Sequence, residues 1–410
     1  MEYIERSDYL NQLIEVKNTP DIKVITGIRR SGKSVLTMEF ADYLKANEPD
    51  LNLVVIQLQE LDFEELLEYH ALNRYILEHH IPGKYNVLIV DEVQLCDNFE
   101  RVINSIHSKQ IYDIYITGSN AFLLSSDLAT LFTGRTIEIK VFPFSFSEYM
   151  QYFESPDSLD VCFDGYVRIG GMPGSYVYQT EKKRYEYVKD VYDTILLRDL
   201  VQKYGIRSKA ELLQISEFMM DNISNVLSPN SICDTLNNNH SDITRKTVSK
   251  YIEYLEKAFL FYEVKRYDLR GKKYLENNKK YFICDSSFRY AVNGARNMDF
   301  GRMYENIVYF ELLRRGYEVY IGKLYKKEID FVAQKQNEKI YIQVSDDISD
   351  GKTLEREYSP LLAIKDAYPK MIIARTHHEP YDYQGIQIID LPYWLLNYKT
   401  NREQIAGDTK

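Results

Sequence analysis

Gly27-Ile28-Arg29-Arg30-Ser31-Gly32-Lys33-Ser34 is the stretch of this chain that predicts its fold. It fits the pattern G-x-x-x-x-G-K-[ST], a glycine-rich loop whose backbone N–H groups surround phosphates. Residues 22–26 before it suit a buried strand, and residues 35–46 after it carry apolar side chains at helical spacing. A helix N-terminus attracts an anion, because unpaired N–H groups and the helix dipole point at it. We therefore predict a nucleotide site formed by Gly27, Ile28, Arg29, Arg30, Ser31, Gly32, Lys33, Ser34 and Val35.

Length and composition indicate a multidomain globular protein. The 410 residues exceed one ordinary domain, and 45% of them are apolar. The formal net charge is −10, so the chain lacks the overall basic character that would indicate nucleic-acid binding. A local basic face is still compatible with this net charge. The four cysteines form no C-x-x-C pair, so neither a zinc site nor a disulfide framework is indicated. The sequence shows no secretory signal and no apolar run of membrane-spanning length, so we expect a cytoplasmic protein without membrane contact.

Strands and helices alternate through residues 1–145. The predicted strands are 22–26, 52–58, 85–90, 112–117 and 136–141. The predicted helices are 6–16, 35–46, 62–79, 99–108 and 121–132. The strands are continuously apolar, as a parallel sheet covered by helices on both faces requires. The predicted fold class is multidomain α/β, with a parallel-sheet P-loop ATPase core at residues 1–145.

Two acids, Asp91 and Glu92, follow the apolar run 87–90 at a strand end. In phosphoryl transfer, an acid at this place helps to hold Mg²⁺ together with the hydroxyl of the P-loop, here Ser34. The next acid is placed to orient and activate a water. The alternative is a polar strand end without a catalytic role. We predict Ser34 and Asp91 as the Mg²⁺ site and Glu92 as the catalytic base.

Three further residues are candidates for catalysis at the γ-phosphate. Ser119 and Asn120 follow the strand 112–117, where they would contact the phosphate or the attacking water, or else cap the next helix. Arg135 is a candidate for neutralising transition-state charge in its own or a neighbouring subunit; the alternative is a surface arginine. ATP is expected rather than GTP, because the chain contains no N-K-x-D element.

Several of these stretches together resemble a bacterial and archaeal group of AAA-type ATPases. The matching stretches are 27–34, 87–92, 117–120, 131–135, 142–145, Gly170-Gly171-Met172-Pro173 and Leu197-Arg198-Asp199-Leu200. That group joins such a domain to a C-terminal domain of unknown function with a restriction-endonuclease-like fold. The resemblance covers nearly the whole chain and implies ATP hydrolysis, but it defines no biological role.

Residues 146–208 are predicted to be mostly helical, and residues 209–285 to form a winged helix-turn-helix domain. Three helices precede two strands there, and the turn between the strands is basic. The third helix carries Arg245, Lys246 and Lys250 on its exposed side, residue types that contact DNA. The basic residues of the wing are Lys265, Arg266, Arg270, Lys272 and Lys273. The alternative is a lid or protein-interaction module that does not contact DNA.

Residues 300–398 are predicted to form a separate α/β domain that resembles the nuclease pattern D…[DE]-x-K. Glu305 lies on a helix, Asp330 on a strand and Gln343 on the next strand. In that pattern the acids hold Mg²⁺ and a lysine helps to activate water. Here Ser345 stands at the lysine position and lacks the charge. We therefore expect a degenerate site kept for binding or assembly rather than an active nuclease.

Three functions are compatible with these predictions. The first is an ATPase that couples hydrolysis to the remodelling or regulation of a bound nucleic acid or protein. The second is a nucleotide-gated switch or scaffold with little turnover that presents the C-terminal domain to a partner. The third is an ATP-gated DNA nuclease, which requires a lysine supplied from elsewhere in space. A homo-oligomer is required only if Arg135 acts on a neighbouring subunit.

Overall fold

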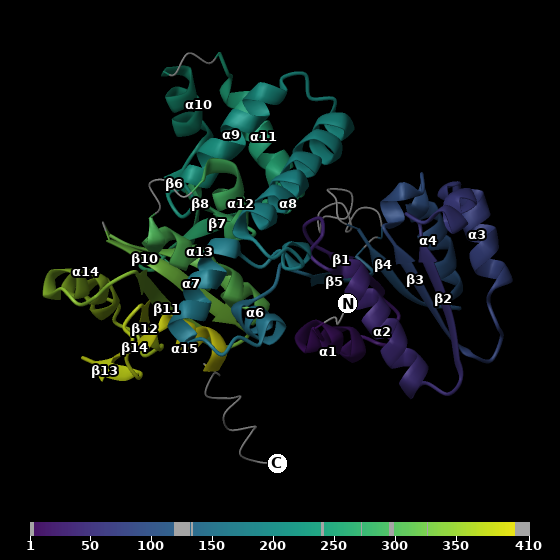
Figure 1. The fold of residues 1–410 in the computed structure, drawn as a ribbon, viewed down its shortest axis with the longest axis horizontal. Helices are drawn as coiled ribbons and strands as arrows, with labels where there is room; N and C mark the ends of the chain where they lie inside the picture. Colours follow the sequence, from purple (N-terminus) through teal and green to yellow (C-terminus); the bar gives the residue numbers. More distant parts are fainter. Residues whose placement is uncertain are drawn as a thin grey trace. The chain divides into compact units, whose positions relative to one another are not determined.

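The computed structural model describes residues 4–118, 132, 134–238, 242–271, 273–294, 299–325 and 327–397 (Figure 1). The chain divides into two compact units. Unit 1 comprises Met1–Pro143, Arg198–Leu200 and Lys257–Phe259, and unit 2 comprises the rest. No helix within the described ranges is long and apolar enough to cross a membrane.

Unit 1 contains, in its described residues, a five-stranded parallel sheet of order β2-β3-β4-β1-β5. Its strands are β1 (Ile22–Thr26), β2 (Leu51–Gln57), β3 (Tyr85–Asp91), β4 (Asp113–Thr117) and β5 (Thr136–Lys140). Its helices are α1 (Ser7–Glu15), α2 (Lys33–Asn47), α3 (Tyr69–Glu78) and α4 (Phe99–Lys109). This arrangement confirms the predicted fold class of a parallel-sheet α/β core.

The central strands of unit 1 are buried on both faces. Val24 and Leu88 pack in a core with α3 and α4, whereas Ile25 and Ile89, their neighbours in the sequence, pack in a second core with α1 and α2. Because a strand needs an apolar side chain on each face to fill both cores, β1 and β3 have continuous apolar runs. The carboxyl ends of parallel strands meet at one edge of the sheet, so the P-loop and the ends of β3 and β4 come together there.

The predicted helix 62–79 is two elements in the structure. A 3₁₀-helix spans Leu61–Leu67, and α3 begins only at Tyr69. Glu68 between them has an extended backbone, and its side chain accepts a hydrogen bond from the N–H of Ala71. This N-cap starts a new helix and so interrupts the one that the apolar spacing predicted.

A buried ion pair lies at the amino ends of the strands β1 and β4, opposite the end that carries the P-loop. Lys23 of β1 is fully buried, and its Nζ lies 2.5 Å from Oδ1 of Asp113 at the start of β4. Asp113 also accepts hydrogen bonds from the N–H of Asn18 at 2.8 Å and from the hydroxyl of Tyr85 at 2.6 Å. With the hydroxyl of Tyr115, which donates at 3.3 Å, one carboxylate therefore satisfies a buried ammonium and three further donors.

We expect Asp113→Ala to lower the free energy of unfolding by about 3–5 kcal/mol, because it leaves the ammonium of Lys23 buried without a charged partner and with only the carbonyl oxygen of Thr19 to accept from it. Urea denaturation followed by fluorescence measures the change. The matched control is Asp42→Ala, which removes the partner of Lys45 from an exposed ion pair on α2; it is expected to cost less than about 1 kcal/mol. Equal losses in the two variants would contradict this account.

Unit 2 is built on a sheet that has nine strands in the described residues, in the order β13-β14-β12-β11-β10-β9-β7-β8-β6. Its strands are β6 (Val226–Leu227), β7 (Phe261–Asp268), β8 (Lys273–Ile283), β9 (Glu318–Leu324), β10 (Lys327–Lys335), β11 (Glu338–Ser345), β12 (Lys370–Ala374), β13 (Tyr381–Tyr383) and β14 (Ile386–Asp390). Its α-helices are α6 (Phe146–Phe153), α7 (Leu159–Ile169), α8 (Glu181–Thr194), α9 (Lys209–Asp221), α10 (Pro229–Asn238), α11 (Arg245–Lys257), α12 (Ser286–Asn293), α13 (Phe300–Arg314), α14 (Gly351–Leu362) and α15 (Leu391–Asn397).

The sheet of unit 2 joins the two segments that the sequence predicts as separate domains. β7 and β8 belong to the segment 209–285, and β9 to β14 belong to the segment 300–398. β7 pairs in parallel with β9, with Arg266 opposite Ile321 and Asp268 opposite Lys323. This continuity was not predicted from the sequence, because the pattern of a strand predicts its faces but not which edge strand completes its hydrogen bonds.

Candidate nucleotide site and a second polar cavity

The P-loop connects β1 to α2 with the backbone of an anion-binding loop. Gly27, Arg30 and Gly32 have φ values of 143°, 63° and 96°. Left-handed residues that alternate with right-handed ones form concave nests of N–H groups that bind anions. A Cβ on Gly27 would lie 2.1 Å from the carbonyl oxygen of Val141, so only glycine fits at this position. The backbone therefore fits the polyphosphate that the motif predicts.

Lys33 lies at the centre of the P-loop. Its Nζ donates to the carbonyl oxygens of Gly27 at 3.0 Å and Ile28 at 3.1 Å. Burial lowers the pKa of Lys33 to about 8, while attraction to Glu92 and Asp91 opposes this shift. Phosphate oxygens would compete with the two carbonyls for this ammonium, because they carry full negative charge.

Asp91 joins the P-loop to the ends of two strands through hydroxyl groups. Its Oδ1 accepts a hydrogen bond from Oγ1 of Thr117 at 2.5 Å, and its carboxyl group also hydrogen-bonds with Ser34. Burial raises the pKa of Asp91, and the two hydrogen bonds oppose the rise. Ser34 and Asp91 are therefore adjacent, as the predicted Mg²⁺ site requires, and oxygen ligands are what Mg²⁺ prefers.

Thr117 is a site residue that the sequence analysis missed. It is the last residue of β4, and its Oγ1 accepts a hydrogen bond from the N–H of Glu92 at 2.9 Å. The same hydroxyl donates to Asp91, so it positions both acids. The signal that could have found it is its place at the end of the strand beside β3.

Glu92 has the backbone and the surroundings of a functional residue. It is 7% exposed, and its φ of 53° and ψ of 48° place it in the left-handed region. Such conformations are uncommon for residues other than glycine and concentrate at functional sites. Its carboxylate accepts a hydrogen bond from Nε2 of Gln94. Its negative charge attracts the side chains of Lys33 and Arg29 and favours their charged forms. The structure thus brings the predicted base to the P-loop.

Arg29 of the P-loop is engaged by Asp199, which the sequence analysis did not predict as a site residue. Its Nε lies 3.0 Å from Oδ2 and its Nη2 3.3 Å from Oδ1 of that carboxylate. Asp199 belongs to the π-helix Ile195–Gln202 and to the short segment assigned to unit 1. The stretch Leu197–Leu200, which matches the family pattern without an assigned role, therefore contributes a buried partner for the loop.

Arg135 lies too far away to act on the phosphate site of its own chain. It is exposed just before β5, and its carbonyl oxygen accepts a hydrogen bond from the N–H of Ile22 at 2.9 Å. Ile22 begins β1, whereas the P-loop follows Thr26 at the other end. Four strand steps span about 13 Å, which exceeds the reach of an arginine side chain. The predicted role in cis is therefore wrong, and the role in a neighbouring subunit stays a prediction.

The predicted γ-phosphate contacts Ser119 and Asn120 lie outside the described residues.

The basic residues of α11 are exposed. Arg245, Lys246 and Lys250 face solvent, while Val248 and Ile252 are buried on the opposite side of the helix. This amphipathic pattern is compatible with the predicted DNA contact, which stays a prediction.

Arg266 is not part of an exposed basic wing. Its side chain is 14% exposed, and its Nη2 lies 3.5 Å from Oε2 of Glu328. The pairing of β7 with β9 brings this side chain to a carboxylate of the next strand, β10. Lys265 and Arg270 of the predicted wing are exposed, and Lys272 lies outside the described residues.

Glu256 near the end of α11 is expected to make stability fall with rising pH. Burial, and then repulsion from Glu263, raise its pKa from 4.5 to about 8, while Lys279 opposes the shift. Between pH 4.5 and 8 the unfolded chain releases this proton while the folded chain keeps it, so stability is lost as pH rises through this window.

Glu256→Gln is therefore expected to stabilise the protein by about 1–2 kcal/mol at pH 8, after allowance for partial solvent screening, and to have little effect at about pH 4, below both pKa values. Denaturation curves at several pH values test this expectation. The control, Glu379→Gln at an exposed position, should give a difference that does not depend on pH. A pH-independent effect of Glu256→Gln would contradict the assignment.

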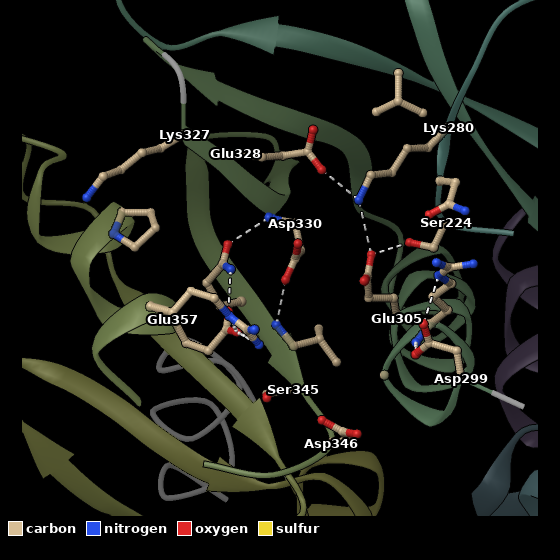
Figure 2. A pocket seen from close by; sticks show the side chains of 18 of the residues that line it. Ser224, Lys280, Asp299, Glu305, Lys327, Glu328, Asp330, Ser345, Asp346 and Glu357 are labelled. Carbon is tan, nitrogen blue, oxygen red and sulfur yellow. Dashed lines mark hydrogen bonds and ion pairs between the residues drawn. The ribbon is translucent and has the colours of Figure 1, made fainter. Parts of the chain in front are cut away.

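The predicted nuclease-like residues meet at a cavity of about 620 Å³ in unit 2 (Figure 2). Glu305 of α13, Asp330 of β10 and Gln343 of β11 line it. The amide of Gln343 accepts a hydrogen bond from the N–H of Asp330 at 2.9 Å and donates to Glu357 at 2.8 Å. Gln343 therefore positions two acids, and burial is the main cause that raises the pKa of Asp330.

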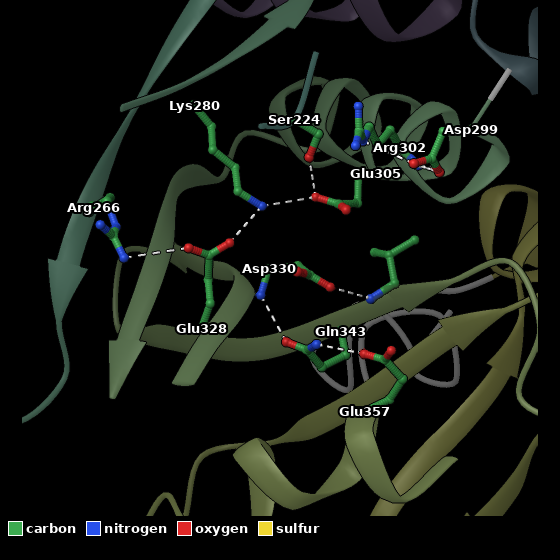
Figure 3. A network of polar contacts seen from close by, with 11 residues as sticks. Ser224, Arg266, Lys280, Asp299, Arg302, Glu305, Glu328, Asp330, Gln343 and Glu357 are labelled. Carbon is green, nitrogen blue, oxygen red and sulfur yellow. Dashed lines mark hydrogen bonds and ion pairs between the residues drawn. The ribbon is translucent and has the colours of Figure 1, made fainter. Parts of the chain in front are cut away.

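The structure adds Lys280 of β8 to this cavity, which the sequence analysis missed. Its Nζ lies 2.8 Å from Oε1 of Glu328 and 3.2 Å from Oε2 of Glu305, and its side chain is 5% exposed (Figure 3). Ser345, at the position expected for a lysine, instead donates to the carbonyl of Asp347. No single-sequence signal links Lys280 to these acids, because only the packing of β8 beside α13 brings them together.

The side chain of Asn306 holds β8 against α13. Its amide accepts a hydrogen bond from the N–H of Ile283 and donates to the carbonyl of the same residue, each at 2.9 Å.

Across the ranges that the structure describes, no group of three or more His, Cys, Asp or Glu side chains is arranged to hold a metal ion by itself.

Comparisons with known proteins place the P-loop unit in a described family. Residues 19–150 match the family described as "AAA domain", and residues 162–299 match "Domain of unknown function (DUF8612)". An uncharacterised protein of Haemophilus influenzae is 38% identical over 402 residues, which cover 96% of this chain and 98% of that protein. An uncharacterised protein of Methanocaldococcus jannaschii is 28% identical over 389 residues, which cover 89% of this chain and 84% of that protein.

Solved structures give partial likenesses. The Aeropyrum pernix ORC1 protein in complex with DNA has a TM-score of 0.32 at 13% identity and covers 71% of this chain and 93% of that one. The replication initiator DnaA bound to AMPPCP and single-stranded DNA has a TM-score of 0.32 at 14% identity and covers 61% and 86%. Because these TM-scores are low, the fold assignment rests on the sheet order and the P-loop described above.

Proposed function

This chain belongs to the same family as the Haemophilus influenzae protein and contains an AAA-type P-loop ATPase domain, and from this premise we propose that it is a Mg²⁺-dependent ATPase. The observation that carries the proposal is the hydrogen-bonded set of Ser34, Asp91 and Thr117 beside the P-loop lysine. A P-loop without an acid and a hydroxyl in this arrangement would bind phosphate but would lack a place for the cation.

Each residue of the set has a separate task in hydrolysis. The P-loop N–H groups and Lys33 would hold the β- and γ-phosphates, and Ser34 and Asp91 would hold Mg²⁺. Bound Mg²⁺ supplies neutralisation of the charge on the phosphate oxygens. Glu92 takes a proton from the water whose oxygen attacks the γ-phosphorus, as the bond between that phosphorus and the bridging oxygen breaks.

The experiment is a measurement of ATP binding and turnover on the full chain. We expect ATP with Mg²⁺ to raise the melting temperature and to be hydrolysed, hydrolysis to stop in EDTA, and GTP to be a poor substrate. Binding without turnover would favour the nucleotide switch over the ATPase. The absence of both would overturn the proposal.

We propose further that hydrolysis is coupled to the remodelling or regulation of a bound nucleic acid or protein. The feature that supports a nucleic-acid partner is the exposed row of Arg245, Lys246 and Lys250 on α11. Binding of a labelled DNA duplex should weaken steeply with salt, since each neutralised phosphate releases a counterion. No binding at low salt would leave a protein as the partner.

A further inference from the structure

The side chain of Arg29 in the P-loop is held by a carboxylate from a distant part of the chain. Nε of Arg29 lies 3.0 Å from Oδ2 of Asp199, and its Nη2 lies 3.3 Å from Oδ1 of the same group. The two residues are 170 positions apart in the sequence, and both belong to unit 1. Paired contacts of this kind fix the plane of a guanidinium, because its donors form a rigid fork. Asp199 therefore sets the orientation of the Arg29 side chain.

One corner of the Arg29 guanidinium is left for another ligand. Asp199 uses Nε and Nη2, and within the described part of the chain the structure gives no hydrogen bond to Nη1. The side chain of Arg29 is 21% exposed, whereas that of Asp199 is 6% exposed. Because the arginine is more accessible than its partner, an anion can reach the two N–H donors of Nη1 without displacing Asp199.

Arg29 lies beside the groups that the ATPase proposal assigns to the γ-phosphate and the attacking water. The carbonyl group of Ile28 forms the peptide bond with Arg29, and its oxygen accepts a hydrogen bond from Nζ of Lys33 at 3.1 Å. Burial alone would lower the pKa of Arg29, but the contact with Asp199 and the attraction to Glu92 together raise it. A cation near both Lys33 and Glu92 lies near the place of the γ-phosphate.

Hydrolysis of ATP needs a positive charge at this place. The transition state carries negative charge on the transferred phosphoryl group and on the leaving oxygen, and an arginine that neutralises it commonly accelerates hydrolysis by about 10³- to 10⁵-fold. Arg135 does not supply this charge within the chain, because it lies by the start of β1, at the end opposite the P-loop. Arg29 belongs to the loop itself.

We propose that Arg29 is the cation that contacts the γ-phosphate within its own chain, and that Asp199 is the residue that positions it. Nη1 of Arg29 donates to a γ-phosphate oxygen while Nε and Nη2 stay on Asp199. The guanidinium keeps its protons: the water oxygen forms the new bond to phosphorus, the water proton passes to Glu92, and ADP leaves with the electron pair of the broken bond. This inference rests on the ATPase proposal and adds that one chain suffices for hydrolysis.

The test compares ATP with ADP on the full chain, since only ATP carries the phosphate that Arg29 contacts. We expect Arg29→Ala to lower single-turnover hydrolysis by about 100-fold or more and ATP affinity by about tenfold, with ADP affinity within about threefold. Arg29→Lys, which keeps the charge but not the fork, should recover part of the hydrolysis. Equal losses of affinity for ATP and ADP would show a structural role and overturn the proposal.

Asp199→Asn tests the positioning role. Asparagine keeps the shape of the side chain but holds the guanidinium without a charge, so hydrolysis should fall by about tenfold with ATP affinity within about threefold. The double variant Arg29→Ala, Asp199→Asn should hydrolyse ATP no more slowly than Arg29→Ala alone, because Asp199 acts through Arg29. The matched control is Asp190→Asn, at an exposed acid of α8, which should retain wild-type hydrolysis. A further loss in the double variant, or no loss in Asp199→Asn, would contradict the positioning role.

A charge supplied by a neighbouring subunit is the competing explanation. With Arg29 acting in its own chain, turnover per chain should not rise with protein concentration. Wild-type hydrolysis in Arg29→Ala together with its loss in Arg135→Ala would place the charge on the neighbouring subunit and overturn this inference, while the ATPase proposal would stand. A wild-type chain that neither binds nor hydrolyses ATP would instead overturn the ATPase proposal, and this inference with it.

Discussion

Lys33→Ala is expected to weaken ATP binding by more than about 100-fold and to abolish hydrolysis. Lys33 is 4% exposed, and its ammonium donates to two carbonyl oxygens of the P-loop. Its charge is therefore fixed inside the loop. Truncation to alanine removes the ammonium that lies inside the loop, while the charge of Arg29 is held by Asp199. Isothermal titration with ATP and Mg²⁺ measures the affinity, and phosphate release measures the turnover.

Lys45→Ala is the matched control for this experiment. Lys45 lies in the last turn of the same helix, α2, and pairs with Asp42 at the surface. Its removal changes the charge of the chain by the same amount but should leave ATP affinity within about threefold, since an exposed ion pair contributes little. If Lys33→Ala bound ATP as tightly as Lys45→Ala, the loop would not be the nucleotide site.

Glu92→Gln should lower turnover by about 100- to 1,000-fold and leave ATP affinity within about threefold. Glutamine keeps the shape of the side chain and the hydrogen bond with Gln94, but it cannot accept the proton of the attacking water, a contribution that is commonly worth this factor. The N–H of Glu92 bonds to Thr117 through the backbone, so the substitution leaves the positions of Asp91 and Thr117 intact. The measurements are single-turnover hydrolysis and equilibrium binding of ATP.

Glu60→Gln supplies the comparison, because Glu60 is an exposed acid that lies beyond β2, the neighbour of β3 in the sheet. It should retain the turnover and the affinity of the wild type. A parallel fall of affinity and turnover in Glu92→Gln would indicate that Glu92 supports the loop rather than the chemistry. Wild-type turnover in Glu92→Gln would require another base.

The residues of the nucleotide site could be predicted because each is tied to the end of a strand. The loop 27–34 follows one apolar strand, and Asp91 and Glu92 follow another. In a parallel sheet the carboxyl ends of the strands share one edge, so the order of strands along the chain suffices to bring these residues together. Thr117 was missed only because a threonine at a strand end is ordinary in any sheet.

Other assignments depended on contacts between elements that no local pattern encodes. Arg135 was predicted near the γ-phosphate, but the register of β5 against β1 places it at the opposite edge. Gln343 was predicted only as the third position of a degenerate site, and the structure shows that its amide hydrogen-bonds to the backbone of Asp330 and the carboxylate of Glu357.

The amino-acid sequence by itself determined the P-loop core, its strand ends and the family of the chain, because these follow from periodicity and from motifs that are contiguous. Only the tertiary structure decided that β7 pairs with β9, and that β8 packs beside α13, which brings Lys280 to a cavity with Glu305 and Asp330. The physical reason is that the backbone N–H and C=O groups along a strand can pair with any neighbouring strand of suitable register. The choice of partner is made by the packing of the whole sheet, and it supplied the lysine that the linear pattern lacked.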